Sequence, residues 1–430
     1  MKRRMPVVMA ALAVLAIALC SIYHNRPVPR ADGALPQEFY IWQRSWGDAL
    51  HQALETSDLK PAGYVVFGGE VAWKQGDIRV ARAQVDYKAL KATGLPVGLA
   101  LRIGPYSGPF EKKGQLAATL VELATSLVKE ARQGGIAPTE LQLDFDCAES
   151  KLDGYRVWVE LIAEKVGDVP VIITALPCWL RHRTFRRLVA ETDGYILQVH
   201  SLVRPASADS PMCLCDPVKS RQWIEQAARI GVPFRVALPT YGYVVAFART
   251  GEFVGLSAEG PALSWPADAQ LRSLRADPAA MARLVQDLTR NRPESMQGVI
   301  WYRMPTSDDR LNWSAATLRA VMEGREPRAE LTARVRRTKE GLAELDLVNS
   351  GDDGASLDVT VSAKWQGARL VAADSIGGFR VADVSCGEVR MQAGRLTRLE
   401  QIPPGGQRQV GWLRLSENTE VEADAAPAHP

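Results

Sequence analysis

The sequence predicts an α/β protein, a (β/α)₈ TIM barrel followed by a C-terminal β-sandwich. Over residues 37–325, short runs rich in Val, Ile and Leu alternate with helical patterns, which is typical of parallel βα units. Eight such units fit the roughly 250 residues of a typical barrel. After about residue 328 the helical patterns end and short alternating runs follow, as in small sandwiches. An open doubly wound sheet is the alternative for the first part, but no Gly-rich phosphate loop marks its first turn.

The barrel strands are predicted as short apolar runs bounded by Gly or Pro. In chain order they are residues 38–42, 63–67, 97–102, 141–146, 171–175, 195–200, 234–238 and 298–302. Helices are predicted between them at residues 48–55, 116–132, 155–166, 184–191, 219–230 and 315–323.

The segment between the last two strands is too long for one helix. Residues 244–265 contain two aromatic and β-branched runs separated by Thr-Gly-Glu, which predicts a hairpin. We therefore expect an insertion at about residues 244–290, on the face of the barrel that carries catalytic residues.

The C-terminal part predicts a β-sandwich over residues 329–416. Turn signals separate its alternating runs, which lie at residues 343–348, 357–365, 379–384, 395–402 and 409–415. Such a module either binds carbohydrate or packs against the barrel. Residues 417–430 are acidic and rich in Ala and Pro, so we expect a disordered tail.

The N-terminus resembles an export signal. Met1-Lys-Arg-Arg precedes an apolar run from Pro6 to Cys20, which is shorter than the roughly 20 residues of a membrane-spanning helix. Residues 1–20 are interpreted as a cleaved signal peptide, an uncleaved membrane anchor, or a lipoprotein signal lipidated at Cys20, and residues 21–36 as a linker. All three interpretations place the rest of the chain outside the cytoplasm, in the periplasm or attached to the cell envelope.

Charge and cysteine content narrow the classes of partner. The formal net charge is +3, and basic residues are interleaved with acidic ones, so nucleic acid is not an expected partner. Five cysteines follow Cys20, and Cys213-Leu-Cys215 has no second Cys/His pair at zinc-site spacing. The cysteines are interpreted as structural or incidental, although an oxidising compartment would allow some to pair. No metal and no cofactor are predicted.

Carboxylates gather where the fourth predicted strand ends. Asp144, Asp146 and Glu149 directly follow an apolar run. Such a cluster is costly for folding because like charges repel and burial penalises each charge, and active sites of barrel enzymes lie at this end of the strands. Strand alternation predicts that Gln142, Asp144 and Asp146 share the interior face. These three acids and Glu70, after the second strand, are the predicted catalytic residues.

Aromatic and polar side chains at the other strand ends predict a sugar site. Aromatic faces stack on sugar rings, and two carboxyls divide the work of acid and nucleophile. We expect Glu149 or Glu70 to donate the proton, and Trp301 to form the floor of a sugar subsite. The predicted substrate-binding residues are Trp42, Trp46, Arg102, Tyr106, Gln198, His200, Tyr241, Tyr243, Trp301 and Arg303.

A structural interpretation stays open for several of these residues. Asp144 or Asp146 would then form an ion pair with Arg102, because structural ion pairs also occur at such positions. Glu149 would be an ordinary first-turn acid, and the tryptophans would be core residues.

Three motifs resemble the chitinase-like family 18 glycoside hydrolases across residues 37–325. They are Leu143-Asp-Phe-Asp, Gln198-Val-His and Leu238-Pro-Thr-Tyr-Gly-Tyr. The whole chain resembles more closely a bacterial family, the domain of unknown function number 3142. In family 18 the strand-four motif is D-x-x-D-x-D-x-E, its Glu is the general acid, and the substrate's N-acetyl group is the nucleophile.

The resemblance carries over only in part. Asp144 and Asp146 match the middle and last Asp of the family motif, but Ala148 stands at the position of the general acid and Glu149 follows one residue late. Leu141 replaces the first Asp, and His200-Ser201 replaces a Tyr-Asp pair. The resemblance therefore implies the family's fold more strongly than its chemistry.

Two classes of function stay open. The first is an exported glycoside hydrolase that acts on a polysaccharide or cell-envelope glycan by carboxylate acid/base chemistry, and the retained Asp pair favours it. The second is a non-catalytic carbohydrate-binding or scaffold barrel of the envelope, and Ala148 favours it. A polysaccharide deacetylase would need a metal-binding Asp/His set that the sequence lacks.

Overall fold

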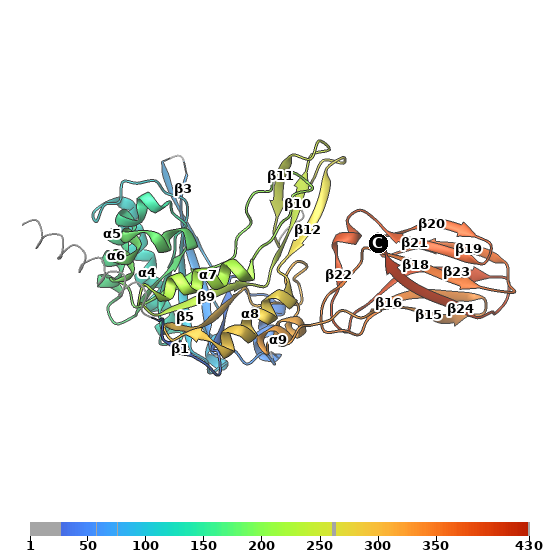
Figure 1. Cartoon of the computed structure of the whole chain (residues 1–430), viewed down its shortest axis with the longest axis horizontal. Coiled ribbons are helices and arrows are strands. Elements are labelled where there is room, and N and C mark those ends of the chain that lie inside the picture. The colour runs from blue at the N-terminus through green and yellow to red at the C-terminus, as the bar shows by residue number, and fades with distance from the viewer. Residues whose placement is uncertain (1–26, 57, 75, 260–263, 429–430) are drawn as a thin grey trace, which may run out of the picture.

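The computed structural model describes residues 27–428 except 57, 75 and 260–263. In this part of the chain, eight parallel strands form a closed barrel in the order β2-β14-β9-β8-β7-β6-β5-β3, and β2 pairs with β3 to close it. The predicted barrel and C-terminal sandwich are confirmed (Figure 1). The barrel strands are β2 (Gln37–Ile41), β3 (Tyr64–Lys74), β5 (Val97–Ile103), β6 (Leu141–Asp144), β7 (Val171–Ala175), β8 (Tyr195–Gln198), β9 (Phe234–Pro239) and β14 (Met296–Tyr302).

Helices surround the barrel because one face of each strand is continuously apolar. Leu141 and Leu143 of β6, for example, belong to the large core between strands and helices. The helices are α2 (Asp48–Thr56), α3 (Tyr87–Ala92), α4 (Gln115–Gln133), α5 (Leu152–Val166), α6 (Arg183–Val189), α7 (Pro217–Ala228), α8 (Pro278–Arg290) and α9 (Ala315–Met322).

The barrel interior is stacked in layers. Its middle layer is apolar and separates a charged layer at the strand starts from a polar and aromatic layer at the strand ends, where Trp42 and Tyr302 pack on it. The middle layer consists of Tyr40, Val65, Ala100, Ile172, Ile196, Ala237 and Ile300.

A charged network closes the end of the barrel where the strands begin. Arg235 donates to Glu38 and to both carboxylate oxygens of Glu140, the latter at 2.6 Å. Gln142 Nε2 donates to Glu140 Oε1 at 2.6 Å, and Tyr40 donates its hydroxyl to Gln142 Oε1 at 2.5 Å. The three charged side chains expose only 12–22% of their surface. Both carboxylates contact the single guanidinium of Arg235, so neither of them is buried without a cationic partner.

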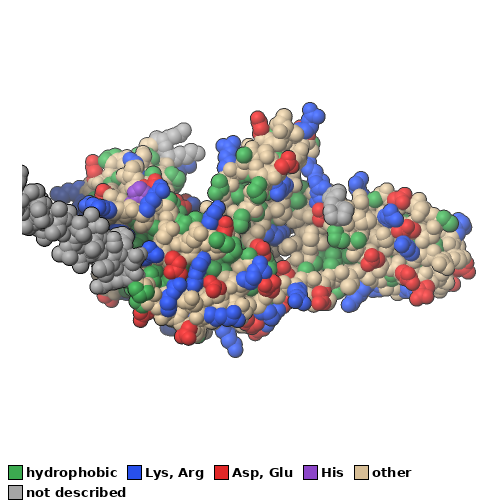
Figure 2. Space-filling view, in the orientation of Figure 1, with side chains coloured by type: hydrophobic (Ala, Val, Ile, Leu, Met, Phe, Trp, Pro, Cys, Tyr) green, Lys and Arg blue, Asp and Glu red, His purple; other side chains and the backbone are tan. Residues whose placement is uncertain are grey.

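The other end of the barrel carries two projections (Figure 1). The first is the hairpin of β3 with β4 (Asp77–Arg82). The second is a three-stranded antiparallel sheet of β10 (Gly242–Phe247), β11 (Phe253–Ser257) and β12 (Gln270–Arg275), which lies between β9 and α8. The surface is hollowed between these projections (Figure 2). This hollow at the carboxyl ends of the strands is called the mouth below.

The C-terminal domain packs two four-stranded antiparallel sheets on one core. Residues 395–402, expected as a strand, instead contain a 3₁₀ helix at Thr397–Leu399 and β22 (Gln401–Ile402), which pairs with β17 (Ala355–Ser356). The first sheet has the strand order β15 (Leu331–Lys339), β16 (Leu342–Asn349), β23 (Gln407–Leu415) and β19 (Leu370–Ser375). The second sheet has the strand order β20 (Phe379–Ser385), β21 (Glu388–Ala393), β18 (Val359–Trp365) and β24 (Val421–Pro427).

The expectation of a disordered tail at residues 417–430 is wrong for the part that the structure describes. β24 pairs with β18 along its whole length. Val421 is buried, Ala423 and Ala425 pack on the sandwich core, and the alternate residues Glu422 and Asp424 face away. This period of two is that of a strand, and the acidic composition concealed it.

The described part of the expected linker, residues 27–36, is attached to the barrel. β1 (Arg30–Ala31) pairs with β13 (Arg292–Pro293), and Arg30 forms an ion pair with Glu225 at 2.9 Å. The expected signal or anchor, with Cys20, lies outside the described residues. No helix within the described ranges is both long enough and apolar enough to cross a membrane. The described cysteines are all free: Cys147, Cys178, Cys213, Cys215 and Cys386.

The sandwich contacts the inserted sheet as well as the barrel. Arg395 donates to the carbonyl oxygens of Ala267 at 2.5 Å and Pro266 at 3.3 Å, and also to Ala269, in the segment before β12. Arg325 forms an ion pair with Asp352. The sandwich therefore supports one wall of the mouth.

Candidate functional site

Asp144 lies at the centre of the mouth, at the end of β6. It accepts hydrogen bonds from Thr174 Oγ1 on β7 at 2.8 Å and from Gln198 Nε2 on β8 at 3.1 Å. Arg102 of β5, its neighbour in register, places Nε 4.0 Å from Asp144 Oδ2. Asp144 is buried, and burial raises its pKa, against the hydrogen bond from Thr174 and the charge of Arg102. The sequence analysis named Arg102 and Gln198 as residues of this site but did not name Thr174. The alternation of side chains along β7 places Thr174 on the inward face.

Glu70 joins the same cluster through arginines. Arg102 Nε lies 3.8 Å from Glu70 Oε1, and Arg44 donates to Glu70 Oε2. Both oxygens of Glu70 therefore face guanidinium groups, but only Arg44 is close enough for a charge-assisted hydrogen bond, which is a strong one. Glu70 is placed to hold Arg102 in position, and a role for it as proton donor is not what this geometry favours.

Asp146 follows β6 and is exposed to solvent at the mouth. Partial desolvation and then the charge of Asp144 raise the pKa of Asp146 to about 6, against the effect of Arg102. The next residue is anchored, because Trp179 Nε1 donates to the carbonyl oxygen of Cys147 at 3.1 Å. Asp146 is therefore a water-accessible carboxyl beside an anchored stretch of backbone, and its pKa of about 6 lets it carry a proton near pH 6.

The structure does not bring Glu149 into this cluster. Glu149 starts a 3₁₀ helix, Glu149–Lys151, and its carboxylate lies 3.8 Å from Arg181 and 3.9 Å from His182, which follow β7. A shift of one residue along a turn changes the direction of a side chain, and Ala148 occupies the position one residue earlier. The prediction that Glu149 donates the proton is corrected on this ground.

Aromatic side chains form one wall of the mouth. Trp42 meets Tyr302 edge to face, with ring centroids 5.5 Å apart. His200 stacks on Tyr302 at 5.7 Å and places Nδ1 3.2 Å from the hydroxyl of Tyr241. Tyr241 in turn meets Tyr243 at 5.3 Å. Trp42, Tyr243 and Tyr302 keep part of their rings exposed, whereas Tyr241 and Nε2 of His200 are buried and support them. Exposed ring faces with a hydroxyl edge are the combination that a sugar ring requires.

Trp301 cannot form the floor of a sugar subsite. It has no exposed surface, its Nε1 donates to Gln37 Oε1 at 2.9 Å, and its ring packs against Trp313 at 6.0 Å. It belongs to the core between strands and helices. Because side chains alternate along β14, Ile300 and Tyr302 face inward and Trp301 faces outward. Tyr302 is the inward-facing aromatic residue of β14, and the sequence interpretation chose its neighbour Trp301 instead.

Three other predicted binding residues lie away from Asp144. Arg303 is nearly buried in an ion pair with Asp309 of the loop before α9. Trp46 packs edge to face on His51 of α2 at 6.1 Å. Tyr106 donates its hydroxyl to the carbonyl oxygen of Pro109 at 3.0 Å and packs on Trp158 of α5. In the described residues, no group of three or more His, Cys, Asp or Glu side chains is arranged to hold a metal ion.

His200 should stay neutral over the pH range in which most enzymes work. Burial lowers the pKa of His200 to about 4, so the imidazole takes up a proton only below that pH. We expect its NMR ring signals to titrate near pH 4, and His200→Gln to leave the shape of any pH profile between pH 5 and 8 unchanged. A His200 titration near 6.5, the value of a free imidazole, would contradict this assignment.

Comparison with known proteins gives one family and several distant structures. The family model "Domain of unknown function (DUF3142)" matches residues 111–307, which confirms the resemblance that the sequence predicts. No curated protein sequence matches the chain. The spore cortex-lytic enzyme SleL of Bacillus megaterium QM B1551 is 11% identical with a TM-score of 0.46, over 70% of this chain and 76% of that chain.

Two chitinases are among the other structural matches. The chitinase from Chromobacterium violaceum ATCC 12472 is 15% identical with a TM-score of 0.46, over 68% of this chain and 99% of that chain. The GH18 chitinase ChiB from Flavobacterium johnsoniae is 11% identical with a TM-score of 0.44, over 68% of this chain and 94% of that chain.

Proposed function

We propose that this protein is an exported glycoside hydrolase that holds a polysaccharide or cell-envelope glycan in the mouth and cleaves it with Asp146 as the proton donor. The observation that supports this most is the pairing of two unlike carboxyls. Asp146 is exposed with a pKa of about 6. Asp144 is buried, which raises its pKa as well, but hydrogen bonds from Thr174 and Gln198 and the charge of Arg102 favour its ionised form. Neighbouring carboxyls with different environments are the usual basis for acid and charge-stabilising roles in glycoside hydrolysis.

The proposed reaction needs no group beyond the chain, the glycan and water. Asp146 gives its proton to the glycosidic oxygen as the bond from that oxygen to the anomeric carbon breaks. Asp144, next to Asp146, stabilises the positive charge that develops on the sugar. Water adds to the anomeric carbon, and its proton returns to Asp146. The aromatic wall, Trp42 and Tyr302 above all, orients the sugar ring.

A second candidate function is glycan binding without cleavage. It is favoured by the absence of an acid at Ala148 and by the ion pairs that occupy Glu149 and Glu70. Asp146 would then accept hydrogen bonds from sugar hydroxyl groups.

One experiment separates the two candidates. Purified protein is incubated with chitin, peptidoglycan, and neutral β-linked and α-linked glucans, and both pulldown and release of reducing ends are measured. Cleavage of any of them by the wild type, lost in Asp146→Asn, supports the hydrolase. Binding without release supports the binding candidate, and neither binding nor release refutes both.

Export forms part of the proposal and rests on the basic and apolar N-terminus, residues 1–20. Residues 1–36 fused to alkaline phosphatase should give activity, because that enzyme is active only outside the cytoplasm. Cys20→Ser should abolish labelling by radioactive palmitate if Cys20 is lipidated. A phosphatase fusion that is inactive but well expressed would refute export.

A further inference from the structure

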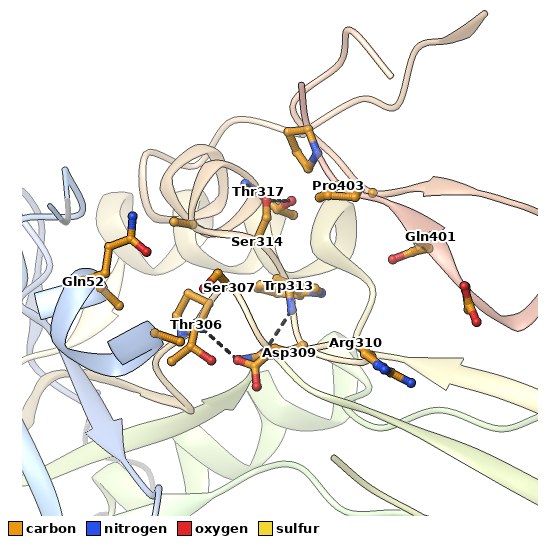
Figure 3. Close-up of a pocket in the computed structure, with 18 of the residues that line it drawn as sticks. Gln52, Thr306, Ser307, Asp309, Arg310, Trp313, Ser314, Thr317, Gln401 and Pro403 are labelled. Carbon is orange, nitrogen blue, oxygen red and sulfur yellow. Dashed lines mark hydrogen bonds between the residues drawn. The ribbon is translucent and has the colours of Figure 1, made fainter. Parts of the chain in front are cut away.

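A second cavity lies between the barrel and the sandwich, with a volume of about 720 Å³. Its barrel side consists of α2 and the loop between β14 and α9, and its sandwich side consists of residues around β22. Figure 3 shows Gln52 and Gln401 reaching this cavity from opposite sides, with Thr306 and Ser307 between them. We call this cavity the interdomain cleft. Its volume is within the range of about 300–1,000 Å³ that is usual for ligand sites.

Charges in the interdomain cleft are largely cancelled in pairs. Asp309 forms an ion pair with Arg303 and accepts from the backbone N–H of Thr306 at 2.8 Å. Arg408 donates to Glu400 at 2.5 Å. Arg310 also lines the cleft and forms no ion pair in the described part of the chain. Beside this one guanidinium, the cleft offers a ligand neutral groups, namely the amide of Gln401 and the hydroxyls of Thr306 and Ser307. A multiply charged ligand would find only the guanidinium of Arg310 to pair with, whereas a neutral hydrogen-bonding ligand would find an amide on the sandwich side and hydroxyls on the barrel side.

Apolar surface accompanies these polar groups. Pro305, Pro403 and Pro404 line the cleft together with Ala49 and Ala53 of α2. Trp313 lies beneath, and its ring is fixed because Nε1 donates to the carbonyl oxygen of Ala276 at 2.9 Å. A surface with both rigid apolar patches and neutral amide and hydroxyl groups matches a sugar, whose rings have C–H faces and hydroxyl edges.

The position of the cleft relates it to the mouth. α2 follows β2, which leads into Trp42, and the loop of Thr306 and Ser307 follows β14, which ends in Tyr302. Each barrel wall of the cleft thus follows a strand, β2 or β14, and the carboxyl ends of these two strands also form part of the mouth. The mouth and the cleft are therefore linked by the two short segments that follow β2 and β14.

We propose that the interdomain cleft binds a neutral oligosaccharide segment, the distal part of the glycan that the mouth holds. The ligand class rests on the proposed function, whereas the site rests on the cleft itself. The two domains then act as two linked sites on one chain, so affinity should rise with glycan length beyond what the mouth alone provides.

The test fills the cleft and leaves the mouth intact. Ser307 is an exposed loop residue that lines the cleft, so Ser307→Trp places an indole in it. Gln401→Ala removes an amide from the opposite side and serves as a second variant. Ser385→Trp, at an exposed position on β20 that does not line the cleft, is the matched control. Binding of short and long chitooligosaccharides and β-glucan oligosaccharides to the full chain is measured by calorimetry.

We expect Ser307→Trp to weaken binding of long oligosaccharides by about tenfold or more and to leave short ones, which occupy only the mouth, unchanged. Ser385→Trp should bind both like the wild type. Equal affinity of the wild type and both cleft variants for long oligosaccharides refutes the cleft site but not the proposed function. Failure of the wild type to bind any of these neutral oligosaccharides refutes the cleft site, and the glycan panel above then decides separately on the proposed function.

Discussion

Replacing Asp146 by Asn should lower the turnover of a glycan that the wild type cleaves by at least about 100-fold, because a positioned general acid contributes about 10²–10⁴ to the rate. Asn keeps the size of Asp but cannot give up a proton to a leaving oxygen. Asp146 is exposed and follows β6, so the thermal midpoint of unfolding should change little. Initial rates of reducing-end release and a thermal melt measure both effects, and glycan binding should remain.

Asp153→Asn is the matched control, because Asp153 is an exposed acid in the first turn of α5, a few residues after Asp146. It should retain wild-type activity. The pH profile gives an independent check: a pKa of about 6 means that the proton needed for donation is lost above that pH. Turnover by the wild type should therefore fall as the pH rises above about 6. Full activity of Asp146→Asn, or a rate that is flat from pH 5 to 8, would contradict the role of Asp146 as acid.

The sequence predicted the barrel because the evidence for it is local. Each strand is a short apolar run, and alternation within β6 correctly separates Leu141 and Leu143 from Gln142 and Asp144. The same alternation, applied to β14, would have chosen Tyr302 over Trp301. Trp301 was preferred for its residue type, and a large aromatic ring is as useful to the core as to a sugar site.

The direction of side chains after a strand ends could not be predicted in the same way. Past Asp144 the chain leaves the ladder, and a 3₁₀ helix begins at Glu149. Its carboxylate is directed by Arg181 and His182, which lie more than thirty residues later in the sequence. Likewise, the partners of Arg303 and Glu70 come from loops and neighbouring strands. Such pairings depend on the tertiary structure, which no single-strand pattern contains.

The charged layer at the strand starts was not predicted at all. Glu38, Glu140 and Arg235 belong to three different strands or their approaches, and nothing near each residue in the sequence indicates the other two. They meet because the barrel closes and because Gly98 leaves space: a Cβ there would lie 2.8 Å from Cγ of Glu140. A long-range ion network of this kind is visible only once the strand order and register are known.

Arg235→Met should produce the largest loss of stability. Removing one partner of a buried ion network leaves uncompensated charge, which costs about 3–5 kcal/mol, and here two carboxylates, Glu38 and Glu140, lose the same partner. We expect the free energy of unfolding in urea to fall by about that amount. Arg229→Met, at an exposed position just after α7, is the matched control and should be nearly neutral.

Two further measurements distinguish the cost of a buried carboxylate without a partner from the cost of lost packing. In the Arg235→Met background, Glu140→Gln removes one of the two unpaired carboxylates and should recover part of the lost free energy of unfolding. Burial already raises the pKa of Glu38, against the opposing effect of Arg235, and loss of Arg235 should raise it further. A carboxyl whose pKa is higher in the folded than in the unfolded state destabilises the fold as the pH rises through that interval. The loss of free energy of unfolding caused by Arg235→Met should therefore be smaller at pH 4.5 than at pH 8. A deficit that is equal at both pH values, with no recovery by Glu140→Gln, would mean that Arg235 acts by filling space, and the charge network would then not be what stabilises this end of the barrel.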